Sequence, residues 1–414
     1  MSSTNNIRIV DYIVVTVLLV ASTVLFFGST VNYFIASIVI VSVLTIVELM
    51  TNKSMKNELL QLKNYGYLRW FVAFFLFIAV HYYFVHWDSL VFLRRMRIWL
   101  PALLMMLWLM RIKDEDLLIF FGKCCVLATI PFGAVILINN DLLMAIALGE
   151  RLGDTETGMN ANMIALCLLF LFYFSFVLFN KEPRWRPFVI VVLIGLAAAT
   201  FITGCRRAVL AMFLILIVYS LCFGSKARRI RNIFLMVVVV AVVVYLMIHV
   251  EYLYDILGYR FLKLFDSIGL IHSPGIVDSD DYSTEIRKEF VPLAIKMFFE
   301  NPILGNGYGY FIMHNGLDTL QQSYNTHNNY LELLVSYGIV GFALYYSIIV
   351  STVVKLIKYR KKDETLVFLL LFMFINLVLV DPTTVHFTVY SIFYVQYYIC
   401  YRMVNSREYI RSPK

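Results

Sequence analysis

Charged side chains are scarce in this sequence, and their scarcity excludes a water-soluble domain. Aspartate, glutamate, lysine and arginine make up 15% of the 414 residues, whereas hydrophobic residues make up 61%. This is more apolar surface than a soluble domain can bury, and the uncharged runs are long enough to cross a bilayer. The sequence therefore predicts an all-α polytopic membrane protein.

The cysteine and histidine patterns that mark metal or redox sites are lacking as well. Among the six cysteines, Cys124 and Cys125 are adjacent inside an apolar run, and none shows the spacing of a metal or redox motif. The histidines other than His327 show no pairing that suggests a metal site; they are His81, His86, His249, His272, His314 and His386. We therefore expect no metal, no other cofactor and no disulfide framework.

Twelve apolar segments are interpreted as membrane spans. They cover approximately residues 10–27, 31–49, 70–84, 90–110, 118–138, 160–179, 188–203, 208–224, 233–250, 333–354, 366–380 and 388–401. The fourth contains Arg94, Arg95 and Arg97 unless it begins nearer Ile98. Most of the 35 lysines and arginines fall on alternate connections, which by the positive-inside rule face the cytoplasm. We predict cytoplasmic termini, and a net charge of +8 that reflects topology rather than a nucleic-acid partner.

One connection is much longer than the others and divides the chain into three parts. Residues 1–250 hold the first nine predicted spans, residues 251–332 form a large extracytoplasmic loop, and residues 333–414 hold three more spans and a cytoplasmic tail. An external loop of this size is normally functional.

The large loop contains a predicted amphipathic helix over residues 283–297. Ile286, Phe290, Leu293 and Met297 recur at helical spacing, so the helix would lie along the membrane surface or cover a cavity. Pro292 should kink it. The glycine-rich segment 305–309 that follows is interpreted as a flexible turn.

After the loop, a histidine leads into the tenth predicted span. His327, Leu331, Leu334, Gly338 and Gly341 would fall on one face of a continuous helix. Glycines on such a face usually let a neighbouring helix approach closely. His327 would then lie above a tight helix contact, either as a catalytic base or as an interfacial polar residue.

Arginines on the predicted external side are the other candidate site residues. Arg206 and Arg207 follow a very short turn between two spans, Arg287 lies on the amphipathic helix, and Arg151 precedes the sixth span. Planar guanidinium groups bind phosphate oxygens through paired hydrogen bonds. These arginines therefore suit a lipid-linked phosphate or diphosphate, with phospholipid headgroups as the alternative ligand.

Three ordered motifs together resemble the O-antigen polymerase and O-antigen ligase superfamily. They are Gly204-Cys205-Arg206-Arg207-Ala208, the segment from Arg287 through Asn301-Pro302-Ile303-Leu304-Gly305-Asn306-Gly307, and His327-Asn328-Asn329-Tyr330-Leu331 followed by Gly338 and Gly341. The resemblance covers residues 151–341. The family usually has a small hydroxyl residue before the arginine, where this chain has Cys205, which leaves open whether Arg206 or Arg207 is the matching residue.

This resemblance implies a GT-C type glycosyltransferase in the bacterial inner membrane, with its active site facing the periplasm. It implies a polyprenyl-diphosphate-linked glycan donor, a glycan or lipid-core acceptor, and metal-independent transfer with inversion at the anomeric carbon. A chain-length regulator is a further candidate partner. The implied roles are diphosphate binding for Arg206 or Arg207 and for Arg287, and activation of the acceptor hydroxyl for His327.

The residue chemistry is consistent with these roles. A diphosphate leaves without a general acid once cations neutralise its charge, so one base and two or three arginines suffice. Glu332 is the rival base, but five residues along a helix it would point away from His327. We favour His327 as the base, with Glu332 and Arg151 as additional candidate residues.

Other functions compete with this interpretation. Asp278-Ser279-Asp280-Asp281 contains the Asp-x-Asp pattern of metal-dependent glycosyltransferases, but acidic residues before a helix also favour its dipole, and we prefer that explanation. A flippase or transporter should show two repeated halves, which the sequence lacks. Residues 327–342 resemble the polymerases of the superfamily most, and a ligase that moves the glycan onto a lipid A core is the alternative.

Overall fold

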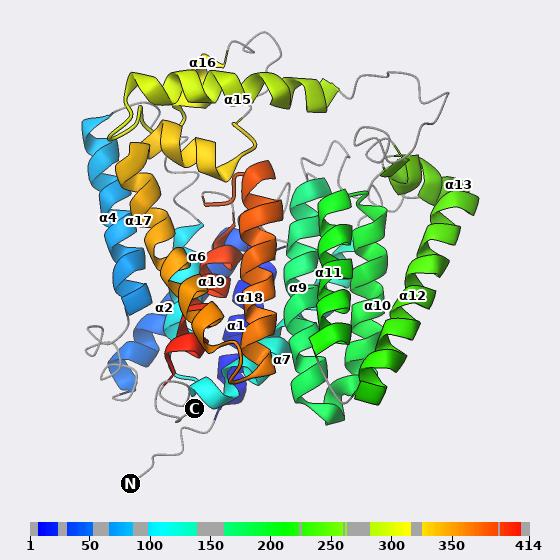
Figure 1. The fold of residues 1–414 in the computed structure, drawn as a ribbon. Helices are drawn as coiled ribbons and strands as arrows, with labels where there is room; N and C mark the ends of the chain where they lie inside the picture. The colour runs from blue at the N-terminus through cyan, green and yellow to red at the C-terminus, as the bar shows by residue number, and fades with distance from the viewer. Residues whose placement is uncertain are drawn as a thin grey trace. The chain divides into compact units, whose positions relative to one another are not determined.

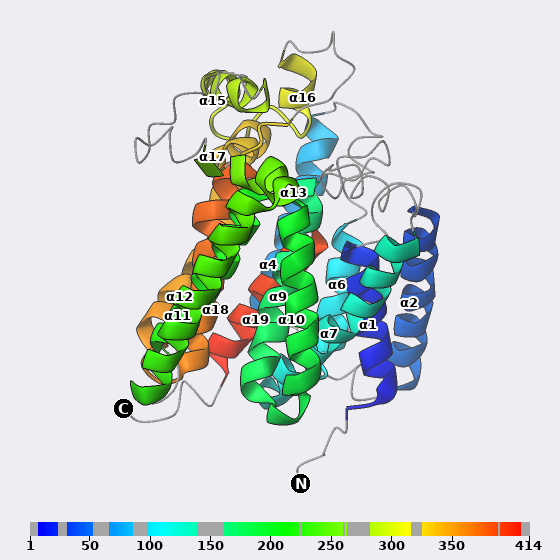
Figure 2. The same ribbon diagram turned by 90° about the vertical axis from the view of Figure 1, so that its right-hand side faces the viewer.

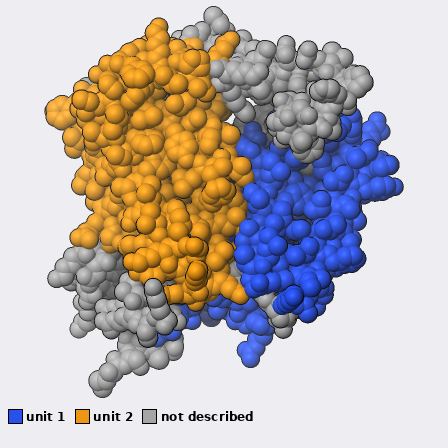
Figure 3. Space-filling model, in the orientation of Figure 1, with its two compact units in different colours: residues 1–46, 108–277 blue, residues 47–107, 278–414 orange. Residues whose placement is uncertain are grey.

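The computed structural model describes residues 7–23, 31–52, 66–85, 98–138, 161–222, 226–259, 261–262, 282–315, 325–387 and 390–406. Within these ranges the regular elements are all helices, with no strand. The chain divides into two compact units, which Figure 3 colours separately. Unit 1 comprises Met1–Ile46 and Trp108–Val277, and unit 2 comprises Val47–Leu107 and Asp278–Lys414.

Unit 1 is built mainly from long apolar helices. Its elements are α1 (Ile9–Thr23), most of α2 (Val31–Thr51), α7 (Asp114–Ile138), α9 (Ala161–Lys181), η3 (Pro183–Trp185), α10 (Arg186–Ile202), α11 (Arg206–Cys222), α12 (Lys226–His249), α13 (Glu251–Leu253) and η4 (Tyr254–Gly258). Helices α9 to α12 run side by side in Figure 1 and Figure 2.

The core of unit 1 is organised around α9, which is buried along almost its whole length. Helices α7, α10 and α11 pack against it, and α1 packs against α7. Most of its side chains are aliphatic or phenylalanine, and a helix that is apolar all round is stable when other helices surround it.

A buried carboxylate binds two arginines at one end of unit 1. The Asp11 carboxylate, with a relative exposure of 2%, lies 3.0 Å from the Arg111 guanidinium and 3.6 Å from that of Arg8. Arg111 also lies over the Trp108 ring. Burial of a carboxylate is tolerated when cations compensate it. The contact fixes the start of α1 against the connection between α6 and α7, whose cytoplasmic location stays a prediction.

Unit 2 contains the amphipathic helix and the helix that follows the large loop. Its elements are α4 (Gly66–Phe84), most of α6 (Trp99–Leu109), α15 (Tyr282–Glu300), α16 (Tyr310–His314), α17 (Asn329–Tyr359), α18 (Glu364–Ile375), η6 (Asn376–Val380), η7 (Asp381–Thr383) and α19 (Ser391–Asn405).

Helix α17 is the centre of unit 2. It contacts α4, α15, α16, α18 and α19, and α15 lies across its first turns in Figure 1. The contact with α15 is apolar: Phe290, Ala294 and Met297 pack with Phe311 and Val335. This confirms the predicted amphipathic helix, which continues on both sides of Pro292 and covers the beginning of α17.

Each of the twelve predicted spans overlaps a helix, but fewer helices are of spanning length. Among the described residues, eight helices are long and apolar enough to cross a membrane. Helices α1, α6, α11 and α19 are shorter, and α6 begins only at Trp99, after residues 91–97, which lie outside the described residues. The protein is a multi-helix membrane protein. The count of twelve, the GT-C likeness and the three-part division stay predictions.

Candidate functional site

The site region begins with a hydrogen-bonded loop before α17. Asn328 is the N-cap of this helix, and its side-chain oxygen accepts hydrogen bonds from the backbone N–H groups of Tyr330 and Leu331, at 3.0 and 3.1 Å. Asparagine is among the best N-cap residues, because its side chain satisfies N–H groups that have no partner inside the helix. The helix therefore begins at Asn329, and His327 lies before it.

His327 has a left-handed backbone conformation, with φ of 51°. Its backbone N–H donates to the Asn325 side-chain oxygen at 2.9 Å, and its ring is nearly parallel to that of Phe290 on α15, with centroids 6.3 Å apart. The His327 side chain is partly exposed. Left-handed conformations are uncommon for residues other than glycine and persist where surrounding contacts enforce them.

Glu332 is one of those surrounding contacts. Its carboxylate is completely buried, and one oxygen accepts the backbone N–H of Thr326 at 3.0 Å. The Thr326 hydroxyl in turn donates to the Asn328 carbonyl at 2.8 Å. The residues on both sides of His327 are therefore tied to the first turns of α17.

The predicted stripe of five residues on one continuous helix is wrong in two places. His327 precedes the helix, and α17 is broken at Gly338, where φ is 60° and ψ is −165°. The periodicity argument assumed a helix without a break. Gly341 does lie close to another helix, because a Cβ atom there would be 3.0 Å from the Phe77 ring on α4.

The break in α17 is filled by the turn formed by residues 301–307. The carbonyls of Val335 and Ser336, which an unbroken helix would use internally, accept the N–H groups of Asn306 and Gly307 at 2.8 and 3.0 Å. On the other side of the break, the N–H groups of Ile339 and Val340 donate to the carbonyls of Pro302 and Ile303. All four are backbone hydrogen bonds.

Residues 305–309 do form a turn, as predicted, but the start of this turn is fixed by hydrogen bonds to α17. Gly305 has a φ of 79°, and a Cβ atom there would overlap the backbone of α17 at Tyr337. The His81 ring of α4 also contacts this turn, with Nε2 2.7 Å from the Leu304 carbonyl. Non-helical backbone inside a membrane protein is tolerated where protein satisfies its polar groups, as happens here.

A hydrogen bond also links α15 to α16 near this turn. The Tyr310 hydroxyl donates to the Glu300 carboxylate at 2.6 Å. This hydrogen bond is the main cause of a raised pKa for Tyr310, because the protonated phenol is the form that donates it. The contact holds the two ends of the turn region together.

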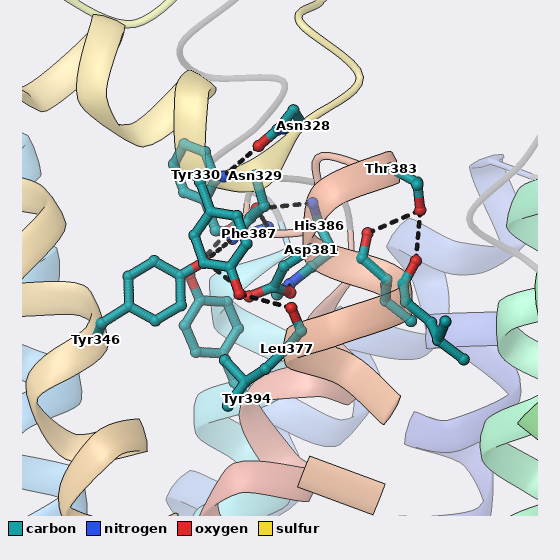
Figure 4. Close-up of polar contacts among 12 residues, drawn as sticks. Asn328, Asn329, Tyr330, Tyr346, Leu377, Asp381, Thr383, His386, Phe387 and Tyr394 are labelled. Carbon is teal, nitrogen blue, oxygen red and sulfur yellow. Dashed lines mark hydrogen bonds and ion pairs between the residues drawn. The ribbon is translucent and has the colours of Figure 1, made fainter. Parts of the chain in front are cut away.

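A buried polar network lies behind the start of α17 (Figure 4). The Asn329 side chain donates to the Tyr346 hydroxyl at 3.0 Å, and that hydroxyl donates to the Asp381 carboxylate at 2.7 Å. The other Asp381 oxygen contacts Nε2 of His386. The Asn329 side-chain oxygen accepts the backbone N–H groups of His386 and Phe387 at 3.0 and 3.2 Å. Asn329, Asp381 and His386 have no exposed side-chain surface.

Sequence reasoning missed this network. It treated His386 as an interfacial or cavity residue and did not consider Asp381. The available signal was an acid and an imidazole five residues apart, directly after the apolar segment 366–380. Ionisable groups beside such segments are costly and often functional, and should be examined as pairs.

Arg206 and Arg207 begin α11 in unit 1. Both are partly buried, and Cys205 before them is buried. The Thr203 hydroxyl accepts the backbone N–H of Cys205 at 3.2 Å. A hydroxyl group is thus present at this helix start, two residues before the cysteine that departs from the family pattern.

An apolar cavity of about 240 Å³ lies along α11 and α12 within unit 1. Its lining residues are Leu210, Phe213, Val240, Val243, Val244, Met247, Ile248, Tyr254, Gly258, Phe261 and Leu262. Leu210 and Phe213 follow Arg206 at intervals of four and three residues, so these three share one face of α11. Arg207 starts the adjacent face.

Some predicted site residues cannot be placed. Arg287 belongs to α15, but its side chain lies outside the described residues, as do Arg151 and the acidic segment 278–281. Within unit 2, the structure brings together the loop of His327, the Glu332 carboxylate and the turn 301–307. Arg206 and Arg207 belong to the other unit.

Comparison with known protein families supports the motif-based assignment. Residues 191–346 match the family model described as O-antigen ligase. The matched segment begins in α10 and ends in α17, so it includes both arginines at the start of α11, the turn 301–307 and His327. No curated protein matches the chain significantly. Residues 191–346 are therefore similar to the O-antigen ligase family, and this similarity supports the O-antigen polymerase and O-antigen ligase superfamily.

Proposed function

We propose that this membrane protein is an inverting, metal-independent glycosyltransferase that polymerises polyprenyl-diphosphate-linked repeat units of a bacterial surface polysaccharide. The reaction takes place on the extracytoplasmic side of the inner membrane, and both termini are cytoplasmic. The observation that carries the proposal is the loop of His327, in which a partly exposed imidazole is held in a left-handed conformation by contacts on both sides. Uncommon backbone conformations of this kind cluster at functional sites.

His327 acts as the general base in this mechanism. Its ring removes the proton of the acceptor hydroxyl as the hydroxyl oxygen attacks the anomeric carbon, from the side opposite the diphosphate. The bond between that carbon and the diphosphate oxygen breaks, and the lipid diphosphate leaves with the bonding electron pair. A positioned base that takes the proton during attack is the usual role of histidine in such transfers.

Glu332 holds this base in place and is not itself the base. Its carboxylate is completely buried and accepts the backbone N–H of Thr326, next to His327. Removing the carboxylate would leave that N–H without its partner and loosen the loop. Asn325 and Asn328 restrain the same loop through their own side chains.

The leaving diphosphate is bound by arginines, with Arg206 as the principal one at the start of α11. The N-terminus of a helix favours an anion through its backbone N–H groups and its dipole, and guanidinium groups bind phosphate oxygens through paired hydrogen bonds. Arg206 shares its helix face with Leu210 and Phe213 of the apolar cavity, which suits a diphosphate attached to a hydrocarbon tail. Arg287 and Arg151 complete the proposed set from segments whose side chains are outside the described residues.

The test compares His327→Asn with the wild-type protein in lipid nanodiscs supplied with a lipid-linked glycan donor. Asparagine tolerates the left-handed conformation but is not a base, so the loop should keep its shape. Turnover should fall by on the order of 10²- to 10⁴-fold, while donor binding is retained. His314→Asn, on the exposed end of α16, is the matched control. Near-normal turnover of His327→Asn would exclude the base role.

A ligase that transfers the finished glycan to a lipid core is the second candidate, because the matched family model is described as O-antigen ligase. Deletion of the gene separates the two functions. Surface polysaccharide reduced to single repeat units indicates a lost polymerase. Long chains that accumulate on the carrier lipid indicate a lost ligase.

A further inference from the structure

The buried network of Asp381 and His386 contains more polar atoms than it has hydrogen bonds. Both side chains are completely buried, and Asp381 is already paired with Nε2 of His386 and with the Tyr346 hydroxyl. This contact occupies Nε2 of the His386 ring. The other ring nitrogen, Nδ1, has no hydrogen-bond partner among the described residues.

Other polar groups without partners come from three neighbouring elements. They are both side-chain atoms of Asn376 on η6, the hydroxyl of Tyr345 on α17, and the hydroxyl of Tyr397 on α19. Within the described part of the chain none makes a hydrogen bond of regular geometry, although the Tyr397 hydroxyl and the Asn376 side chain are close enough to interact. The rings of Tyr345 and Tyr397 each lie 6.4 Å from the His386 ring between centroids. Tyr397 also lies near Asp381 and Asn376.

Leaving these groups unpaired would be costly. A buried amide or hydroxyl without a hydrogen bond keeps its full desolvation cost, so a dry cluster of four such side chains would remove a large part of the stability of an ordinary domain. Buried waters typically bind where two to four polar groups converge. Water also suits Nδ1 of His386 in either protonation state, because it can both donate and accept.

We propose that Nδ1 of His386, Asn376, Tyr345 and Tyr397 enclose a closed site for ordered water molecules. The water molecules donate hydrogen bonds to the acceptors and accept hydrogen bonds from the donors among these atoms. Asn329 connects this site to the start of α17, because its side-chain oxygen holds the backbone of His386 and Phe387. The water site therefore supports the helix start next to His327.

Radiolytic footprinting of the intact protein in nanodiscs tests the proposal. A short X-ray pulse converts bound water to hydroxyl radicals, which oxidise adjacent side chains even where bulk solvent has no access. Tyr345 and Tyr397 are the reporters, with relative exposures of 0% and 1%. Tyr67 and Tyr394 are matched controls, because they are equally buried but donate their hydroxyls to the carbonyls of Tyr394 and Phe387.

We expect Tyr345 and Tyr397 to be oxidised several-fold faster than Tyr67 and Tyr394. When the bulk water is replaced with H₂¹⁸O, ¹⁸O should appear only slowly in the oxidised Tyr345 and Tyr397, because the bound water exchanges slowly. Asn376→Leu, which removes two of the polar atoms, should slow oxidation of Tyr397 in a protein that still elutes as a folded species. If Asn376→Leu does not fold, the comparison within the wild-type protein stands alone. Equal rates for all four tyrosines, or immediate incorporation of ¹⁸O at the rate of the exposed Tyr83, would overturn the closed water site.

Discussion

Helices α9 and α17 are the central helices of their units, yet they are constructed differently. α9 runs without interruption from Ala161 to Lys181 and buries aliphatic and phenylalanine side chains on all sides. α17 is 31 residues long, is broken at Gly338, and buries Asn329, Glu332 and Ser336 near its start. Both have the composition of a membrane span.

The difference indicates that α9 mainly provides a packing surface, whereas the first part of α17 holds candidate site residues in place. α9 needs only shape and hydrophobicity from its neighbours. The first part of α17 depends on particular hydrogen bonds. They lie between Thr326 and Glu332, between the turn 301–307 and the residues on both sides of the break, and between Asn329 and the residues before α19. We expect conservative apolar substitutions in α9 to leave folding and activity intact. Single substitutions at the polar or glycine positions of α17 should impair them.

The largest expected effect comes from Gly338→Ala, which should prevent the native fold of unit 2. The conformation at Gly338 is essentially restricted to glycine, with a strain of roughly 1–3 kcal/mol for other residues. The added Cβ would also collide with the Ile303 carbonyl. Thermal unfolding followed by size-exclusion chromatography should show a strongly lowered Tm or no folded species.

Gly195→Ala is the control for this prediction. Gly195 lies inside α10 of unit 1, and a Cβ atom there would meet nothing within 4 Å. Alanine in a helix is favoured over glycine by up to about 1 kcal/mol, so this variant should be as stable as the wild type or more stable. A Gly338→Ala protein as stable as Gly195→Ala would show that the break in α17 is dispensable.

The second prediction separates a positioning role of Glu332 from a base role. Glu332→Gln keeps an oxygen that can accept the Thr326 N–H, so kcat should stay near the wild-type value. Glu332→Ala loses that oxygen, and the resulting displacement of His327 should lower kcat by on the order of 10²-fold. Steady-state kinetics with the lipid-linked donor distinguish the two. A Gln variant as inactive as the Ala variant would return the base role to Glu332.

A smaller effect is expected from lysine substitutions at the start of α11. Lysine keeps the charge but cannot form the paired hydrogen bonds of a guanidinium with a diphosphate. Arg206→Lys should raise the donor KM about tenfold, the equivalent of losing roughly one charged hydrogen bond. Arg207→Lys, on the adjacent helix face, serves as the matched control and should change KM less. Equal changes would contradict the assignment of Arg206 to the cavity face.

The smallest effect is expected from Tyr310→Phe, which removes the hydrogen bond between α16 and α15. The raised pKa of Tyr310 means that the stabilising contact with Glu300 is complete below pH 10 and is lost as the pH rises through the raised value. Tyr310 is only partly buried, so the stabilisation is small. Thermal unfolding at neutral and strongly alkaline pH should show a slight difference that disappears at the alkaline pH. A difference independent of pH would exclude the hydrogen bond as its cause.

The sequence predicts the helices well where one physical effect dominates. The apolar segments all overlap helices, and the spacing of Phe290 and Met297 correctly indicated a helix with one buried face. The Asn-Pro-Ile-Leu-Gly-Asn-Gly segment was singled out as part of a family pattern, and His327 from helical spacing as well as from that pattern. The role of His327 as a base stays a prediction. These features are local in the chain, or belong to the family pattern that the sequence resembles.

The remaining features depend on contacts between distant residues. The break at Gly338 occurs because the turn 301–307 supplies partners for four backbone groups, and helical periodicity contains no information about that turn. Asp381 and His386 join Asn329 across more than fifty residues. Which residues of α11 line the apolar cavity follows from the course of α12 and η4 along this helix. In each case the local structure depends on a contacting residue that is distant in the sequence.

The four hydrogen bonds between the turn and α17 also limit how this part of the chain can vary in length. Pro302 and Ile303 are hydrogen-bonded to Ile339 and Val340. The chain between Ile303 and Asn306 must therefore have the length that lets Asn306 and Gly307 hydrogen-bond to Val335 and Ser336. An insertion or deletion of one residue between Ile303 and Asn306 would place the second pair out of register with the first. Related chains should therefore keep the spacing between these two pairs constant and concentrate their insertions elsewhere in the large loop.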